Sequence, residues 1–151
     1  MDIKLGLGID TNYFGMTQAE IETSLGKPDR ICKDEEYGEF EPMTQYNSLK
    51  TRFTFYKNYD GKLGYIRSSN PKLKYKDQII IGKTLSESLT IFNDIPKDKW
   101  VLEEYDFWVQ YFNEDWWITL RFEYDILSEI EMGVPFKNDE EYNWPLINAS
   151  S

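Results

Sequence analysis

A short motif occurs twice in this chain, and the repeat constrains the fold more than any other feature of the sequence. Gly15-Met16-Thr17-Gln18-Ala19-Glu20 returns as Gly82-Lys83-Thr84-Leu85-Ser86-Glu87, so that positions 17 and 84 are separated by 67 residues. Self-similarity at a fixed period indicates a repeated structural unit, and the sequence therefore predicts two related units. The same offset aligns further apolar pairs: Leu25 with Phe92, Phe53 with Leu120, Phe55 with Phe122, Leu63 with Ile130, and Tyr65 with Met132.

Each copy of the motif predicts the start of a helix. Thr17 and Thr84 stand where an N-cap hydroxyl would accept a backbone N–H, and Glu20 and Glu87 follow three residues later. This spacing is that of a capping box, in which the glutamate side chain reaches back to the N-cap backbone. A proline a few residues downstream ends each helix, because proline cannot continue the hydrogen-bond ladder.

Alternating apolar and polar residues after each helix predict antiparallel strands. Residues 51–56 alternate cleanly, and Asn58-Tyr59-Asp60-Gly61 is typical of a hairpin turn. Residues 3–9 predict a short strand or an extended arm. Residues 30–33 predict a short strand, and the residues that follow them, up to position 48, predict an exposed loop. The second unit predicts strands over 100–107, 108–112, 116–124 and 126–132.

The fold class predicted from these elements is α+β. We expect one domain over 1–151, built from two tandem helix-plus-antiparallel-meander repeats at about 10–70 and 77–133, with an irregular C-terminal tail, 134–151. The two meanders would share one twisted sheet with both helices on one face.

The charge balance restricts the partners that this chain can bind. Its 17 basic and 27 acidic residues give a net charge of −10. Nucleic acids and anionic membranes require clusters of lysine and arginine, so we expect neither as a partner. The charge favours a basic protein partner, although an acidic surface also serves solubility alone.

The sequence offers little support for catalysis. It contains no histidine and one cysteine, Cys32, which excludes a Ser-His or Cys-His pair, a Cys/His zinc site and an intrachain disulfide. Adjacent carboxylates such as Glu103 and Glu104 are more typical of solvated charge than of a catalytic pair. We therefore expect a non-enzymatic protein without cofactor or metal. Because the N-terminus lacks the pattern of a signal peptide, we also expect a cytoplasmic location.

The period of two in a strand assigns its side chains to opposite faces of the sheet. Residues 116, 118, 120, 122 and 124 form the apolar series that we assign to the core. Aromatic anchors among fixed charges are typical of protein-binding surfaces, and the opposite face is the candidate site. In the alternative, the aromatic tail covers the tryptophan and the charges belong to an ordinary solvated sheet. The candidate partner-binding residues are Tyr56, Trp117, Arg121, Glu123, Glu129 and Glu131.

Residues 14–30 resemble a known protein family. Phe14-Gly15-Met16-Thr17-Gln18-Ala19-Glu20-Ile21, followed by Leu25-Gly26-Lys27-Pro28-Asp29, is similar to the G-M-T-x-x-E-(V/I)…L-G-x-P-D helix of the beta-lactamase-inhibitor-protein-like superfamily. That resemblance implies tandem helix-plus-sheet repeats and a sheet face that binds another protein. The second copy lacks the Leu-Gly-x-Pro-Asp ending, and the chain lacks the paired cysteines of the secreted inhibitors and the lipidated cysteine of the assembly lipoproteins.

The resulting hypothesis is a cytoplasmic protein-binding module, and specifically an immunity protein that covers the active surface of a basic toxin domain. Such a module would be a monomer or a weak dimer. Two alternatives stay open: a hydrolase that uses carboxylates or an oxygen-liganded metal, and a scaffold or assembly subunit. A hydrolase would require a deep cleft that gathers several acidic residues.

Overall fold

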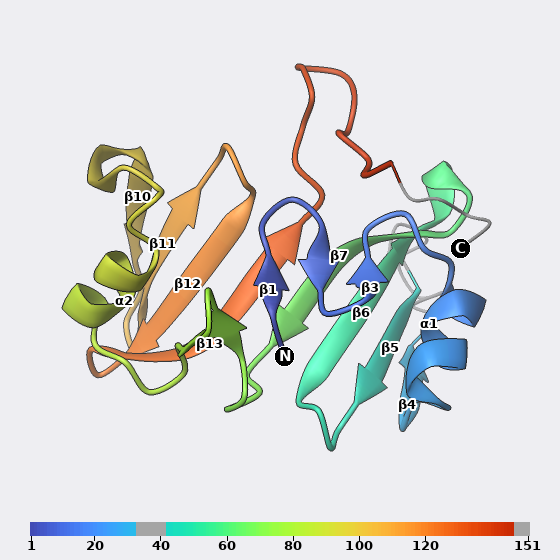
Figure 1. The fold of residues 1–151 in the computed structure, drawn as a ribbon, viewed down its shortest axis with the longest axis horizontal. Helices are drawn as coiled ribbons and strands as arrows, with labels where there is room; N and C mark the ends of the chain where they lie inside the picture. Colours follow the sequence, from blue (N-terminus) through green and yellow to red (C-terminus); the bar gives the residue numbers. More distant parts are fainter. Residues whose placement is uncertain (33–41, 147–151) are drawn as a thin grey trace.

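The protein is an α+β structure with two short helices and one large antiparallel sheet (Figure 1). It is represented by a computed structural model that describes residues 1–32 and 42–146. The helices are α1 (Gln18–Leu25) and α2 (Leu85–Ile91), and short 3₁₀ turns form η1 (Lys57–Tyr59) and η2 (Lys97–Lys99). In this described part of the chain, no helix is both long and apolar enough to cross a bilayer.

The large sheet has eight strands, and every neighbouring pair is antiparallel. Strands β7 and β13 pair near its middle and join the strands that follow α1 to those that follow α2. In spatial order the strands are β10 (Trp100–Glu104), β11 (Val109–Asn113), β12 (Ile118–Glu123), β13 (Ile126–Gly133), β7 (Lys62–Ser68), β6 (Thr51–Tyr56), β5 (Met43–Tyr46) and β4 (Arg30–Cys32).

Both helices and a small N-terminal sheet lie in front of the large sheet in Figure 1. The segment 3–9, predicted as one strand or arm, forms two two-residue strands instead, β1 (Ile3–Lys4) and β2 (Gly8–Ile9), and β3 (Asn12–Tyr13) follows them. A further hairpin consists of β8 (Lys74–Tyr75) and β9 (Gln78–Ile79). These elements cover one face of the sheet, and Phe136 and Tyr142 of the C-terminal segment pack on aromatic side chains of the other face.

The two predicted capping boxes are confirmed. The Thr17 hydroxyl accepts a hydrogen bond from the Glu20 backbone N–H at 3.3 Å, and the Thr84 hydroxyl accepts one from that of Glu87 at 3.2 Å. Because each helix has only eight or seven residues, its stability comes mainly from packing. One apolar core joins both helices to the sheet, and it includes Ile21, Phe53, Phe55, Ile66, Ile91, Leu120, Phe122, Ile130 and Met132.

One strand was missed in the sequence. Residues 43–46, placed in the predicted loop, form β5 between β4 and β6. Thr44 and Tyr46 of this strand are buried, but the sequence Met-Thr-Gln-Tyr is too short and polar to reveal an apolar alternation. The rest of the predicted loop, residues 33–41, lies outside the described residues.

The prediction for residues 116–124 was wrong at both ends. Strand β12 begins at Ile118 because the preceding residues form a turn, in which the Asn113 side-chain carbonyl accepts the Trp116 N–H at 2.9 Å. Trp116 is 42% exposed, and Tyr124, in the tight turn after the strand, is 93% exposed. Neither residue belongs to the core, whereas the intervening Leu120 and Phe122 do.

Candidate binding face of the sheet

We define the open face as the side of the eight-stranded sheet opposite the helices. Its side chains come from the positions that alternate with the buried core residues, such as Arg52 beside Phe53 and Arg121 beside Leu120. Two rows of polar side chains cross this face because the strands are in register. One row is Glu103, Gln110, Arg121 and Glu129, and the other runs through Thr119, Glu131, Arg67, Arg52, Gln45 and Arg30.

Hydrogen bonds hold the first row in place. The Gln110 side-chain amide donates to Glu103 Oε2 at 3.0 Å, and an Arg121 Nη donates to Glu123 Oε1 at 3.0 Å. The Arg121 guanidinium also lies 4.2 Å from the centre of the Trp108 ring, which is a favourable cation–π geometry. These contacts fix both the charges and their separations before any partner arrives.

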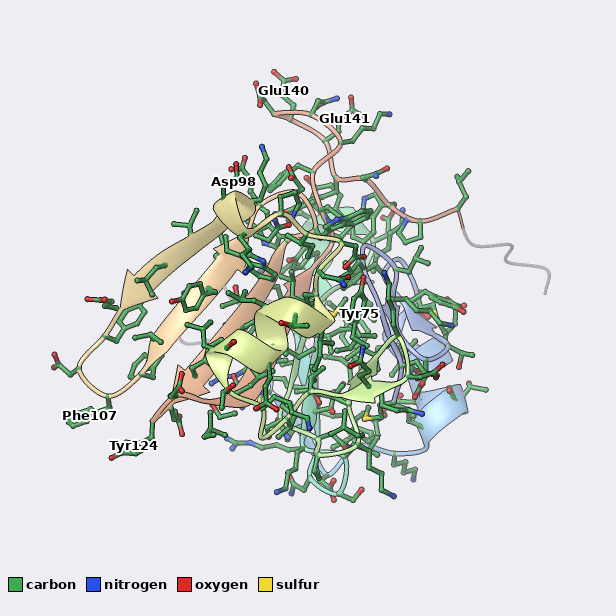
Figure 2. All side chains as sticks on the ribbon, turned by 60° about the vertical axis from the view of Figure 1, so that its left-hand side comes forward. Tyr75, Asp98, Phe107, Tyr124, Glu140 and Glu141 are labelled. Atoms are coloured by element: carbon green, nitrogen blue, oxygen red, sulfur yellow. The ribbon has the colours of Figure 1, made fainter. Side chains whose placement is uncertain are left out.

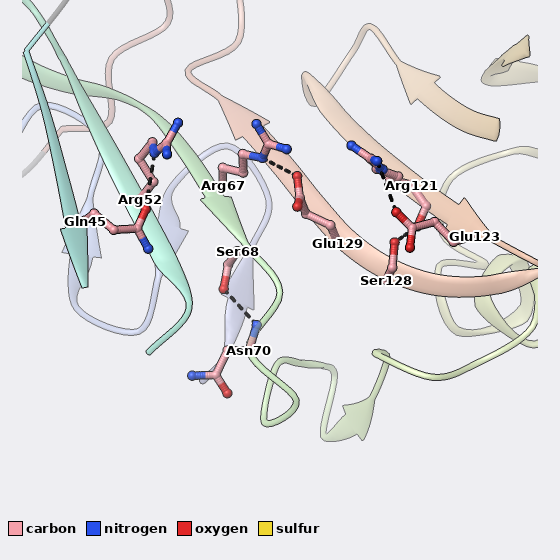
Figure 3. Close-up of polar contacts among 9 residues, drawn as sticks. All are labelled: Gln45, Arg52, Arg67, Ser68, Asn70, Arg121, Glu123, Ser128 and Glu129. Carbon is pink, nitrogen blue, oxygen red and sulfur yellow. Dashed lines mark hydrogen bonds and ion pairs between the residues drawn. The ribbon is translucent and has the colours of Figure 1, made fainter. Parts of the chain in front are cut away.

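An ion pair joins the two rows at the centre of the sheet, where Arg67 Nε of the second row donates to Glu129 Oε1 of the first (Figure 3). Burial alone lowers the pKa of Arg67, but the hydrogen bond and the charge of Glu129 outweigh it and raise this pKa. Burial raises the pKa of Glu131 despite the attraction of Arg67. Burial, followed by the charge of Glu131, raises the pKa of the Tyr65 hydroxyl, which hydrogen-bonds to that carboxylate.

Opposite charges occupy opposite halves of the sheet. Strands β4–β7 contain four basic residues and no acidic residue, whereas β10–β13 contain five acidic residues and one basic residue. This distribution is unexpected in a chain with a net charge of −10. The basic residues are Arg30, Arg52, Lys62 and Arg67, and the residues of the other half are Glu103, Glu104, Arg121, Glu123, Glu129 and Glu131.

Four of the six predicted partner-binding residues lie together on the open face. Arg121 and Glu123 belong to β12, and Glu129 and Glu131 to the neighbouring β13, with Arg121 directly opposite Glu129. Arg121 and Glu123 form an ion pair. The structure therefore brings the predicted charges into one cluster.

The two predicted aromatic residues pack against the C-terminal segment. The Trp117 ring contacts Phe136 at a centroid distance of 5.1 Å, and the Tyr56 ring contacts Tyr142 at 5.6 Å and Trp144 at 6.4 Å. Both residues are half-buried. The tail thus covers the tryptophan, as in the alternative considered from the sequence.

Basic residues of the face were not among the predicted site residues. Lys50, Arg52 and Arg67 line a cavity of about 390 Å³, together with polar side chains that include Gln45 and Glu129. Because residues 51–56 alternate, Arg52 points away from the core residue Phe53, but only the pairing of β6 with β7 sets it directly opposite Arg67. That cross-strand relation is absent from the sequence pattern.

The described residues contain no group of three or more Cys, Asp or Glu side chains placed to hold a metal ion. The carboxylates of the open face are instead engaged by arginine, tyrosine and glutamine, as described above. The arrangement can recognise a charged surface.

Comparisons with known proteins relate the chain to one solved structure. The fold matches a crystal structure described as an extracellular protein containing a SCP domain, from Bacillus anthracis str. Ames, with a TM-score of 0.54 and 16% sequence identity. The match covers 82% of this chain and 46% of that chain, so this chain spans less than half of that protein. No protein-family model matches the chain, and no curated protein matches its sequence.

These findings correct the family prediction. The resemblance of residues 14–30 to the beta-lactamase-inhibitor-protein-like superfamily was wrong, since the fold matches a SCP-domain-containing protein instead and no family model matches. The motif consists of a capped helix and its stop, and such local features recur in unrelated folds. The immunity role was drawn from that resemblance and loses this support, while the cytoplasmic location stays a prediction.

Proposed function

We propose that this chain is a non-catalytic protein-binding module that binds its partner through the open face of the large sheet. The observation that carries the proposal is the separation of charge on that face, with carboxylates over β10–β13 and cations over β4–β7. A partner with the opposite arrangement would be attracted in one orientation and repelled in the reverse one.

The fixed geometry of the charges supports the same proposal. Arg121 is held between Glu123 and the Trp108 ring, and Arg67 is held by Glu129. Charges that are already ordered lose less conformational entropy when a partner binds. A partner for the acidic half would carry lysine or arginine, as predicted for a basic protein, whereas the basic half calls for acidic groups.

A second candidate function is a scaffold or assembly subunit, and one observation favours it. The outer hairpin β10–β11 exposes apolar side chains, with Phe107 78% exposed and Val101 54% exposed, and Tyr124 lies near its tip (Figure 2). Exposed apolar groups at a sheet edge favour association with another chain. Light scattering at high concentration distinguishes the two, because an assembly subunit would show a mass above that of the monomer.

A hydrolase has less support. The cavity on the open face contains one carboxylate, Glu129, and that carboxylate is already paired with Arg67. Carboxylate-based hydrolysis needs two carboxyl groups on either side of the scissile bond. Measuring activity with generic hydrolase substrates would test this alternative directly.

We further propose that the two halves are tandem repeats within one domain, at about 10–70 and 77–133. In support, the ladder of β6 shifts register after Thr54 and that of β12 shifts after Arg121, again 67 positions later. The last strands of the two units, β7 and β13, correspond with a smaller offset of 64 residues. By strand pairing Leu63 corresponds to Leu127, and not to Ile130 as the sequence offset of 67 predicts. The second hairpin turn is shorter, which accounts for the difference. Expressing residues 77–133 alone and measuring its circular dichroism would test whether a repeat folds independently.

The test of the binding function compares three tagged proteins in pull-downs from the source organism. These are the wild type, a face variant Glu103→Lys/Glu123→Lys, and a control Asp98→Lys/Glu114→Lys with the same change in net charge at exposed positions outside the polar rows. We expect the wild type and the control to retain the same protein and the face variant to lose it. Equal retention by all three would show that the open face is not the binding surface.

A further inference from the structure

The basic half of the open face contains a preformed cavity of about 390 Å³. Arg52 from β6 and Arg67 from β7 are directly opposite one another in the sheet, and both guanidinium groups lie on the same side of it (Figure 3). The turn between β5 and β6 adds Lys50. That turn is tied to the residue after β7, since Lys50 accepts a hydrogen bond from the Ser69 N–H at 3.0 Å.

The cations of this cavity exceed its anions. Arg67 is paired with Glu129, whereas the Arg52 Nε donates to the neutral Gln45 side-chain oxygen, at 3.2 Å. Among residues 1–32 and 42–146, no carboxylate forms a salt bridge with Arg52 or Lys50. Like charges placed side by side repel one another, so an anion bound between them would relieve an unfavourable arrangement.

We propose that this cavity is a binding site for a carboxylate group. Arginine presents parallel N–H donors that match the two oxygens of a carboxylate. Lys50 would add a point charge, and the Gln45 amide, whose oxygen is held by Arg52, would present its N–H₂ group as a neutral donor. A carboxylate group suits the site better than a phosphate, because it places a single negative charge beside Glu129, which lines the cavity.

The carboxylate has two possible sources, a free organic acid or an acidic side chain of the protein partner. The second source extends the proposed function and rests on it, since it assigns the acidic part of the partner to the basic half of the sheet. The first source requires no protein partner. The two can be separated by choosing probes of different kinds.

The experiment follows the side-chain N–H signals of Arg52, Arg67 and Gln45 by NMR during titration. The probes are succinate with its neutral diamide as control, and a short polyglutamate peptide with polyglutamine as control. We expect at least one carboxylate probe to shift these signals with a Kd of about 1 mM or tighter, and the neutral controls to shift none. Binding of succinate assigns a free acid, and binding of the peptide alone assigns a polypeptide carboxylate.

Variants test the contribution of each cation. Arg52→Gln should weaken binding at least about tenfold, because it removes the charged fork. Lys50→Gln, at an exposed turn position, should weaken it less. Lys97→Gln makes the same change in net charge in the distant turn η2 and should leave the affinity unchanged.

Three results would overturn the proposal: no shift with either carboxylate, equal shifts with the neutral controls, or unchanged affinity in both Arg52→Gln and Lys50→Gln. Because the Glu103→Lys/Glu123→Lys variant leaves the cavity intact, it should still bind the small carboxylate even if it loses the protein partner. Failure of this site and failure of the binding function are therefore distinguishable.

Discussion

Arg67 of β7 donates a hydrogen bond through Nε to the Glu129 carboxylate of β13, across the pair of strands that joins the two halves of the large sheet. On the opposite face, Ile66 lies opposite Met132 in the same strand pair, and both are fully buried. The centre of the sheet is thus held by an ion pair on one face and by apolar packing on the other. The two contributions can be measured separately.

A double-mutant cycle should show modest coupling between Arg67 and Glu129. The Arg67 side chain is 41% exposed and that of Glu129 is 19% exposed, so solvent screening limits the energy to about 1 kcal/mol. Urea unfolding of Arg67→Gln, Glu129→Gln and the double variant measures it. We expect the coupling to fall as salt is added. Coupling near zero at low salt would contradict the ion pair.

Replacing Glu131 with glutamine should stabilise the protein at neutral pH. Burial raises the pKa of this carboxyl in the folded state, so the folded state retains its proton to a higher pH than the unfolded state. Its contribution to stability is complete below about pH 4, where the unfolded-state group titrates, and falls as the pH rises toward the folded-state pKa. Glu131→Gln removes this loss.

Urea midpoints of Glu131→Gln and wild type at several pH values test this sign. We expect the variant to be more stable at neutral pH and to lose that advantage near about pH 3, where Glu131 is protonated in both states. Glu114→Gln, in an exposed turn, is the matched control and should show little change. A variant that is less stable than the wild type at neutral pH would mean that attraction to Arg67 outweighs burial.

The backbone of Gly64 lies against the ring of Tyr56, which packs with Tyr142 and Trp144 on the open face. A Cβ atom added there would lie 2.2 Å from the Tyr56 ring, far inside van der Waals contact. We expect Gly64→Ala to cost about 1–3 kcal/mol by displacing that ring and to change the fluorescence of Trp144, which packs beside it. In a Tyr56→Leu background the cost should shrink, and an unchanged cost would exclude the steric explanation.

The parts of the fold predicted from the sequence are those in which local signals agree. Thr17 and Thr84 are followed by glutamates at capping-box spacing, and β6 and β12 alternate sharply enough to identify their buried residues. The charged residues Arg121 and Glu129 could be assigned to one face for the same reason. Period and capping are local, so a single sequence reveals them.

The parts that were missed depend on which strands become neighbours. Arg52 and Arg67 lie opposite one another only because β6 pairs with β7, and β5 is stabilised as a strand by β4 and β6 on either side. Trp117 was expected to be an exposed anchor, but Phe136 from the tail packs on it. Such contacts between distant residues leave no periodic signal, and this also explains why a local helix motif misled the family prediction.

The two-residue turn between β12 and β13 should be open to stabilisation. Tyr124 and Asp125 have φ values of +52° and +63°, a conformation that two-residue hairpin turns require and that favours Asn-Gly. Tyr124→Asn/Asp125→Gly should therefore raise the free energy of unfolding by about 1 kcal/mol, because it relieves the left-handed strain at both positions. Asp106→Gly is the control, since Asp106 is an exposed loop residue without a positive φ. Glycine there should lower stability by increasing the freedom of the unfolded chain. If both variants changed stability in the same direction, the effect would come from glycine itself and not from the geometry of the turn.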